Sequence, residues 1–264
     1  MHRSDLYASS TAAQGGALAG LAMATPASQH AEARLNGQRI AEALRLLSTT
    51  VDVQRRIVRA GDTVYQTGQR FSHLYILNSG IFKLLSLSAD GREQVVGLKF
   101  RGDWMGFAGI AKGHYACDAV AMDTGEVWAI RYDTLLAACA RQPELMVLLH
   151  EAMSAEIVRE RESVLSLCTL PADARVADFI SYWADSLASR GLRTDQITLC
   201  MTRAEIGNYL GLTLETVSRA LSKLVRERLI SFAQKGRRDI SIPDIGLLRS
   251  YAQRGQTAAG HTLQ

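Results

Sequence analysis

Residues 202–221 read TRAEIGNYLGLTLETVSRAL, and this stretch decides how the C-terminal third of the chain folds. Thr202 and Glu205 have the spacing of a capping box, in which each side chain bonds the backbone N–H of the other residue at the start of a helix. Gly211 ends that helix, because the tight turn requires a residue that easily adopts a left-handed conformation. Thr213 then caps a second helix. The stretch therefore predicts a helix-turn-helix.

The exposed face of the second predicted helix carries side chains that can read DNA bases. Arg219 can donate two hydrogen bonds to guanine, Glu215 can accept one from cytosine, and Ser218 can bond a base or touch a thymine. Residues 229–242 then read as a hairpin, which we expect to form a wing against the phosphates. The caps and nearby cations are the predicted DNA-backbone contacts, namely Thr202, Arg203, Thr213, Thr216, Lys223, Lys235, Arg237 and Arg238.

The excess positive charge of the chain lies in this same segment. The chain has 30 basic and 26 acidic residues, and residues 202–240 hold eight of the basic and four of the acidic ones. The rest of the chain is therefore balanced, and the local excess suits a surface that faces phosphate. The alternative is a small helical packing motif with a solvated charged face. The capping box, the turn glycine, the reading residues and the basic wing occur in register, which favours DNA.

The middle of the chain has the texture of a β-rich domain. Short apolar runs separated by glycines fill residues 51–132, with the turn signal Asn78-Ser79-Gly80 between two of them. Many short strands at this spacing indicate a barrel or jelly roll. We therefore predict an α+β protein with a β-roll domain over residues 36–140 and a winged helix-turn-helix domain over residues 171–252.

One long helix is predicted over residues 141–170, because 142–167 contain no glycine and only a proline suited to the first turn. Its apolar stripe is either buried in its own domain or pairs with a second copy, and we favour a parallel homodimer. Glu160 interrupts the stripe, and two copies facing each other would repel, making dimerisation marginal. The predicted seam consists of Met146, Leu149, Met153, Ile157, Glu160, Val164 and Leu167.

The two ends of the chain are predicted to be unstructured. Residues 1–35 are rich in small side chains and predict a disordered tail, and residues 253–264 predict a flexible one. The N-terminal apolar run is too short and too broken for a secretory signal. No run of 18 apolar residues occurs, so we expect no membrane span and a cytoplasmic location.

The stretch 202–221 resembles the helix-turn-helix of the CRP/FNR family of transcription regulators, and most of all its FNR branch. Residues 73–110, including LNSGIFK, GREQVVGLKF and RGDWMGFAGI, resemble the β-roll sensory domain of that family. The resemblance covers about residues 40–250. It implies a homodimer that binds a palindrome in double-stranded DNA, contacts RNA polymerase and regulates genes responding to oxygen or redox status. Glu215, Ser218 and Arg219 match the FNR-branch reading residues, which implies a TTGAT-like half-site.

The chain departs from the family at both of its known ligand sites. Cyclic-nucleotide members hold the ribose with Gly-Glu and the phosphate with Arg-Ser, but here Phe107 follows Gly106 and residues 115–118 contain no arginine. We therefore expect no cyclic AMP, since a phosphate would lack a cation. Oxygen-sensing members hold a [4Fe–4S] cluster, which needs four thiolates, and no cysteine precedes Cys117. We expect no cluster either.

The residues do not identify the signal to which the predicted sensory domain responds. Haem could be ligated by His73, His114 or His150, the Cys117 thiol could be oxidised, or activity could depend on dimer stability alone. We predict no cofactor and no metal. No nucleophile–base pair, phosphate loop or metal-ligand cluster stands out, so we expect no enzyme. Two alternatives to the DNA-binding regulator are a redox- or ligand-sensing module that acts through protein contacts and a regulator that responds to cyclic nucleotides.

Overall fold

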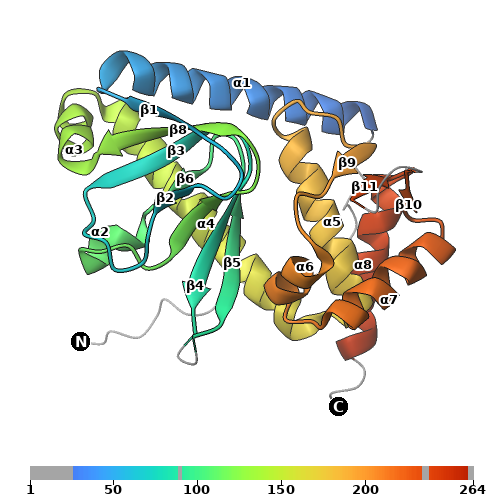
Figure 1. The fold of residues 1–264 in the computed structure, drawn as a ribbon. Coiled ribbons are helices and arrows are strands. Elements are labelled where there is room, and N and C mark those ends of the chain that lie inside the picture. Colours follow the sequence, from blue (N-terminus) through green and yellow to red (C-terminus); the bar gives the residue numbers. More distant parts are fainter. Residues whose placement is uncertain (1–25, 89–90, 234–237, 261–264) are drawn as a thin grey trace, which may run out of the picture.

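The computed structural model describes residues 26–88, 91–233 and 238–260 (Figure 1). In this part of the chain, a β domain is joined by one long helix to a C-terminal domain of helices and a small sheet. This arrangement confirms the predicted α+β class with a β-roll, a long helix and a winged helix-turn-helix.

The β domain consists of two antiparallel four-stranded sheets that enclose an apolar core. The strand orders are β1-β8-β3-β6 and β2-β7-β4-β5. Between the sheets, the rings of Tyr65 and Tyr115 stack with their centroids 4.2 Å apart, and Phe82 is fully buried beside them. The strands are β1 (Gln54–Val58), β2 (Thr63–Tyr65), β3 (His73–Ser79), β4 (Phe82–Leu87), β5 (Glu93–Lys99), β6 (Trp104–Met105), β7 (Asp118–Ala121) and β8 (Gly125–Arg131).

The predicted turn at Asn78-Ser79-Gly80 is confirmed, and it lies where β3 passes into β4. Gly80 has φ of 89°, a backbone conformation that residues with a side chain rarely adopt. A Cβ atom there would also lie 2.9 Å from the Cα of Gly125. The two glycines therefore let the β3–β4 turn pack directly on the start of β8.

Helices cover the outer face of the β1-β8-β3-β6 sheet. Leu47 of α1 (Pro26–Thr50), Leu135 of α3 (Tyr132–Arg141) and Leu149 of α4 (Pro143–Thr169) share one buried cluster with Leu74 and Ile130. A short helix, α2 (Ala108–Lys112), follows β6. Figure 1 shows α1 lying along one side of the molecule, across the β domain and toward the C-terminal domain.

Helix α1 corrects the predicted N-terminal tail. We expect disorder over residues 1–35, but residues 26–35 are helical. This segment contains several alanines and a proline at its first helical position, and both favour a helix start even in a low-complexity stretch. Residues 1–25 lie outside the described part of the chain.

Helix α4 confirms the predicted long helix but not every residue of its seam. Its first half packs on the β domain, so the side chain of Leu149 is only 4 % exposed. The prediction that Leu149 belongs to the dimer seam is therefore wrong, because its own domain already covers it. Met146 and Met153 are partly buried against the same cluster.

The C-terminal domain packs helices against a small sheet of order β10-β11-β9. Trp183, Val217, Leu224 and Leu248 are fully buried in its core. In the described part of the chain, no helix is both long and apolar enough to span a membrane. The elements are α5 (Ala172–Ala188), β9 (Gln196–Thr198), α6 (Arg203–Leu210), α7 (Leu214–Arg226), β10 (Ser231–Phe232), β11 (Asp239–Ser241) and α8 (Ile245–Gly260).

Helix α8 corrects the predicted C-terminal tail. We expect a flexible segment over residues 253–264, but the helix continues to Gly260. Leu248 and Ala252 anchor it in the domain core, and the chain beyond them continues the same helical backbone. Residues 261–264 lie outside the described part.

Candidate nucleic-acid interface

The capping box at the start of α6 is confirmed. The hydroxyl of Thr202 accepts a hydrogen bond from the backbone N–H of Glu205 at 3.2 Å, and the carboxylate of Glu205 accepts one from the backbone N–H of Thr202 at 2.8 Å. The other carboxylate oxygen of Glu205 accepts from Lys83 of β4 at 2.6 Å. Burial raises the pKa of Glu205, but the bonds from Lys83 and Thr202 outweigh it and hold the pKa below its ordinary value.

The turn between α6 and α7 forms as the sequence predicts. Gly211 ends α6 with φ of 62°, the left-handed conformation that glycine adopts at low cost. Gly207 lets the turn close tightly, because a Cβ there would lie 2.6 Å from the carbonyl oxygen of Leu212. Thr213 caps α7 by accepting from the backbone N–H of Thr216 at 3.2 Å. The two helices are thus held at a fixed angle by their own turn residues.

The three predicted reading residues lie on the first turns of α7. Glu215 and Arg219 are exposed, and Ser218 is half-buried. The guanidinium of Arg203 donates to the hydroxyl of Ser218 at 3.0 Å, and that of Arg219 donates to Thr216 at 3.3 Å. The opposite side of the helix is buried in the domain core. An exposed polar N-terminal half and a buried apolar side are what a helix needs to enter a groove.

The structure describes six of the eight residues predicted to contact the DNA backbone. Thr202 and Thr213 are exposed caps whose hydroxyls bond within the domain, and Arg203 also lies over the ring of Phe232, 6.0 Å from its centroid. Arg238 is exposed beside β11. Lys235 and Arg237 lie outside the described residues.

Lys223, a predicted DNA-backbone contact, also has partners within its own domain. Its ammonium bonds the carboxylate of Asp173 at the start of α5 and lies 5.6 Å from the centroid of the Tyr251 ring. Bonds from Asp173 and Tyr251 raise the pKa of Lys223, so it stays charged and paired. The Lys223 side chain is nevertheless 43% exposed, so its contact with the DNA backbone stays a prediction.

The C-terminal domain is docked on the β domain through Asn208 of α6. The side chain of Asn208 accepts from the backbone N–H of Val95 at 2.6 Å and donates to the carbonyl of Glu93 at 2.7 Å. The amide of Gln94 also donates to the carbonyl of Asn208. Together with the Lys83–Glu205 pair, these bonds join α6 to β4 and β5. The sequence does not predict these bonds, because no local pattern marks residues that meet across more than 100 positions.

The candidate ligands for haem or a cluster are dispersed. His73, at the start of β3, shares a hydrogen bond with the neighbouring Ser72. His114 and His150 are exposed on separate segments. The free cysteines Cys117, Cys139, Cys168 and Cys200 also lie on four different segments. Burial raises the pKa of Cys117 above its ordinary value, which disfavours the reactive thiolate. Within the described residues, no three His, Cys, Asp or Glu side chains gather as a metal site would require.

Comparison with known families gives two matches, one for each domain. Residues 55–142 match the cyclic nucleotide-binding domain, and residues 174–251 match the Crp-like helix-turn-helix domain. The first match covers most of the predicted β-roll (36–140) and runs two residues beyond it, and the second lies inside the predicted winged-helix domain (171–252).

Individual proteins with similar sequences carry regulatory names. The Fumarate nitrate reduction regulatory protein of Klebsiella oxytoca is 33% identical over 206 residues, which cover 78% of this chain and 81% of that protein. The Fumarate and nitrate reduction regulatory protein of Escherichia coli K12 is 34% identical over 182 residues, covering 69% and 73%. Among solved structures, FixK2 of Bradyrhizobium japonicum superposes with a TM-score of 0.68 at 26% identity, covering 76% of this chain and 98% of that one.

Proposed function

The chain belongs to the CRP/FNR family of transcription regulators, and from this premise we propose that it binds, as a homodimer, a palindrome of TTGAT-like half-sites. The relatives named for fumarate and nitrate reduction support a role in regulating genes that respond to oxygen or redox status. RNA polymerase is the expected partner at the promoter, and the cytoplasm is the expected location. We propose no enzymatic activity, since the related proteins are regulators.

The observation that carries the proposal is the reading face of α7. Glu215, Ser218 and Arg219 lie on its exposed first turns, while Val217 and Leu224 anchor the other side in the core. Arginine recognises guanine by two parallel bonds, and glutamate accepts from cytosine, so the face suits a mixed sequence containing a G·C pair.

A second copy of the chain is proposed to bind along α4. Its C-terminal half exposes apolar side chains, including Ile157 at 47 %, Val164 at 60 % and Leu167 at 36 %. Apolar residues at this spacing along a helix are typical of a coiled-coil partner. Glu160 is exposed between them and also lines a cavity beside α4, so a dimer would bring two such charges near each other, with no ion-pair partner for either among the described residues. The proposed seam therefore keeps Ile157, Glu160, Val164 and Leu167 at its centre.

We propose no cofactor for this chain. A [4Fe–4S] cluster needs four thiolates at one place, and the four cysteines come from dispersed segments. No haem ligand is assigned, because haem needs only one or two axial ligands and nothing in the positions of His73, His114 and His150 selects one of them. A cyclic nucleotide would require a free cation for its phosphate, and residues 115–118 contain no arginine.

The test is a gel-shift titration of the full chain on a palindrome of two TTGAT half-sites and on a scrambled duplex of the same composition. We expect a preference for the palindrome of at least about a thousandfold at moderate salt. The affinity for both duplexes should fall steeply as salt rises, because phosphate contacts release counterions. Equal affinity for the two duplexes would refute sequence-specific binding.

A further inference from the structure

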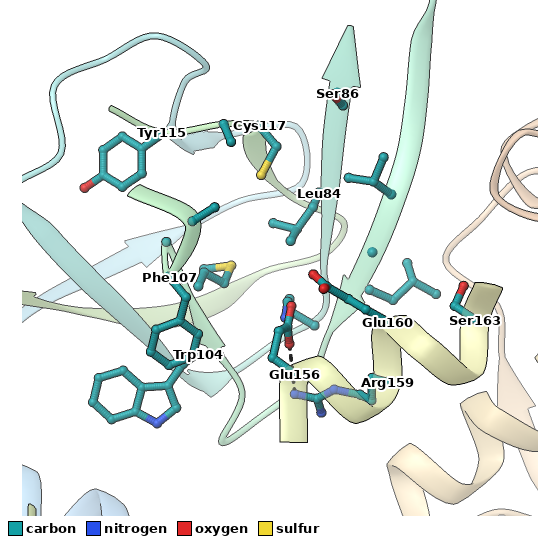
Figure 2. A pocket seen from close by; sticks show the side chains of 18 of the residues that line it. Leu84, Ser86, Trp104, Phe107, Tyr115, Cys117, Glu156, Arg159, Glu160 and Ser163 are labelled. Atoms are coloured by element: carbon teal, nitrogen blue, oxygen red, sulfur yellow. Dashed lines mark hydrogen bonds and ion pairs between the residues drawn. The ribbon is translucent and has the colours of Figure 1, made fainter. Parts of the chain in front are cut away.

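A cavity of about 270 Å³ lies where the β domain, α4 and the C-terminal domain meet. Figure 2 shows α4 on one side of it and the strand carrying Leu84 and Ser86 on another. The wall is completed by residues 104–109 and by Tyr182 and Tyr209 of the C-terminal domain. A molecule in this cavity would therefore contact all three parts of the chain.

The two cations in the cavity wall are already paired with carboxylates, one of which, Asp103, also pairs with Arg190. Lys99 is 2 % exposed, and its ammonium bonds the carboxylate of Glu156. Arg159 donates to Asp103 at 2.9 Å and to Glu156 at 3.2 Å. Neither cation is free to hold a phosphate, because each would first have to leave a carboxylate partner.

Glu160 adds a further carboxylate to the cavity wall. Its carboxylate points from α4 toward the cavity in Figure 2, and it has no ion-pair partner among the residues that the structure describes. A phosphate there would be repelled by Glu160 and attracted by no free cation, so a cyclic nucleotide does not fit.

The remaining wall suits an apolar molecule. Trp104 and Phe107 stack with their centroids 6.1 Å apart, and Leu84 and Leu98 line the cavity with them. The rings of Trp104 and Phe107 are on one side in Figure 2, and the sulfur of Cys117 points inward from another.

One buried hydroxyl in the wall has no hydrogen-bond partner. The hydroxyl of Tyr65 is unpaired among the described residues, although the side chain is only 2 % exposed and lines the cavity. Burial raises the pKa of Tyr65 well above its ordinary value, and the adjacent Cys117 thiol raises it further. A thiol is only a weak hydrogen-bond partner for the hydroxyl. The hydroxyl therefore keeps its proton and is available as a donor, at a cost in free energy until an acceptor arrives.

We propose that this cavity binds an uncharged, largely apolar small molecule that carries one hydrogen-bond acceptor, and that it excludes cyclic nucleotides. The stacked rings and leucines contact the apolar body, Tyr65 donates to the acceptor, and Glu160 repels anions. A role for this ligand in regulating DNA binding rests on the proposed function. Its binding is measured without DNA, so failure of one idea is distinguishable from failure of the other.

The charge preference is tested with two fluorescent probes that differ by one sulfonate, N-phenyl-1-naphthylamine and 8-anilinonaphthalene-1-sulfonate. The neutral probe should bind the full chain saturably, and the sulfonate should bind at least about tenfold more weakly. Glu160→Gln should strengthen binding of the sulfonate and leave the neutral probe unchanged. Equal binding of both probes to the wild-type chain, or displacement of the neutral probe by millimolar cyclic AMP, would overturn the proposal.

The location is tested with neighbouring substitutions on β4. Ser86 lines the cavity, whereas the side chain of Leu87 is 60 % exposed. Ser86→Trp should fill the cavity and weaken the neutral probe by about tenfold or more, and Leu87→Trp should leave it unchanged. An equal effect of the two variants would mean that the probe binds elsewhere and that the assignment is wrong.

The acceptor is tested with Prodan, a neutral naphthalene that carries a carbonyl. Tyr65→Phe keeps the ring and removes the donor, so Prodan should bind about threefold to tenfold more weakly while the amine probe is unaffected. Unchanged Prodan affinity would refute the role of Tyr65. If Ser86→Trp fails to fold, this milder variant and Glu160→Gln decide the question.

Discussion

At the scale of single residues, the reading helix is prepared by bonds within the domain. Arg203 donates to the Ser218 hydroxyl, and Arg219 makes a longer contact of 3.3 Å to Thr216. This contact orients the guanidinium of Arg219 along the exposed side of α7, and the side chain stays exposed. Glu205 is held more firmly, because it accepts both from its own cap and from Lys83.

Arg219→Ala should cost about 1–3 kcal/mol on the TTGAT palindrome and relax discrimination at its guanine, because one bidentate contact is lost. Gel-shift titrations on the palindrome and on duplexes with the guanine replaced measure both effects. Arg226→Ala is the matched control at the exposed end of the same helix. It should change affinity for all duplexes alike. Unchanged affinity and specificity in Arg219→Ala would remove Arg219 from the reading set.

The stability of the chain should fall in acid partly through Glu205. Because its pKa in the folded state is below the ordinary value of 4.5, its contribution is complete above that value and is lost as the pH falls through the folded-state pKa. Urea unfolding between neutral pH and about pH 3 should therefore show a shallower loss of stability in Glu205→Gln than in the wild type. Parallel curves would argue against this role. Glu215→Gln, an exposed residue with no such partner in the described structure, is the control.

At the scale of elements, α4 serves two surfaces in succession. Its first half is anchored by Leu145 and Leu149 in the β domain, while its second half exposes Ile157 and Val164. The periodic pattern along the sequence is the same in both halves. Only the position of the β domain shows where internal packing ends and the surface available to a second copy begins.

Glu160→Ala should tighten the proposed dimer by about twofold to fivefold, because it removes repulsion between like charges in a largely solvated seam. Sedimentation equilibrium at low salt measures the dimer constant, and added salt should reduce the difference. Glu162→Ala removes an exposed charge of the same sign two positions away and should have a smaller effect. A dimer constant that is identical for wild type and Glu160→Ala would contradict a facing pair.

At the scale of the whole molecule, the two domains are joined by bonds as well as by the chain. Asn208 bonds two backbone groups of β5, Glu205 pairs with Lys83, and Arg190 pairs with Asp103 at 3.1 Å. The position of the reading helix relative to the β domain is therefore set by a specific polar contact.

Asn208→Ala should loosen this contact, because two backbone groups of β5 lose their partner. Amide exchange at Val95 should accelerate by about twofold to tenfold, corresponding to one hydrogen bond, while amides in the middle of β3 keep their rates. Asn36→Ala, at an exposed position of α1, should leave Val95 unchanged. Exchange at Val95 that is the same in Asn208→Ala as in the wild type would show that the contact does not hold the domains.

The sequence predicts those parts of this molecule that depend on neighbours along the chain. The capping box at Thr202 and the turn at Gly211 are local patterns, as is the exposed polar side of α7 around Arg219, and each has its expected conformation. The bond from Lys223 to Asp173 and the docking of Asn208 are not local. They depend on which elements the fold brings together, and a basic residue facing DNA and one paired inside its domain have the same local sequence signal.

The contact between Phe100 and Trp183 has a consequence for how the chain denatures. The two rings meet edge to face, 5.4 Å apart, within one apolar cluster that joins β5 to the core of the C-terminal domain. Burial shared across a domain boundary couples the free energies of the two parts. Calorimetry should therefore record a single cooperative transition, and a cavity made by Phe100→Ala should lower the melting temperature of the DNA-reading half together with that of the β domain.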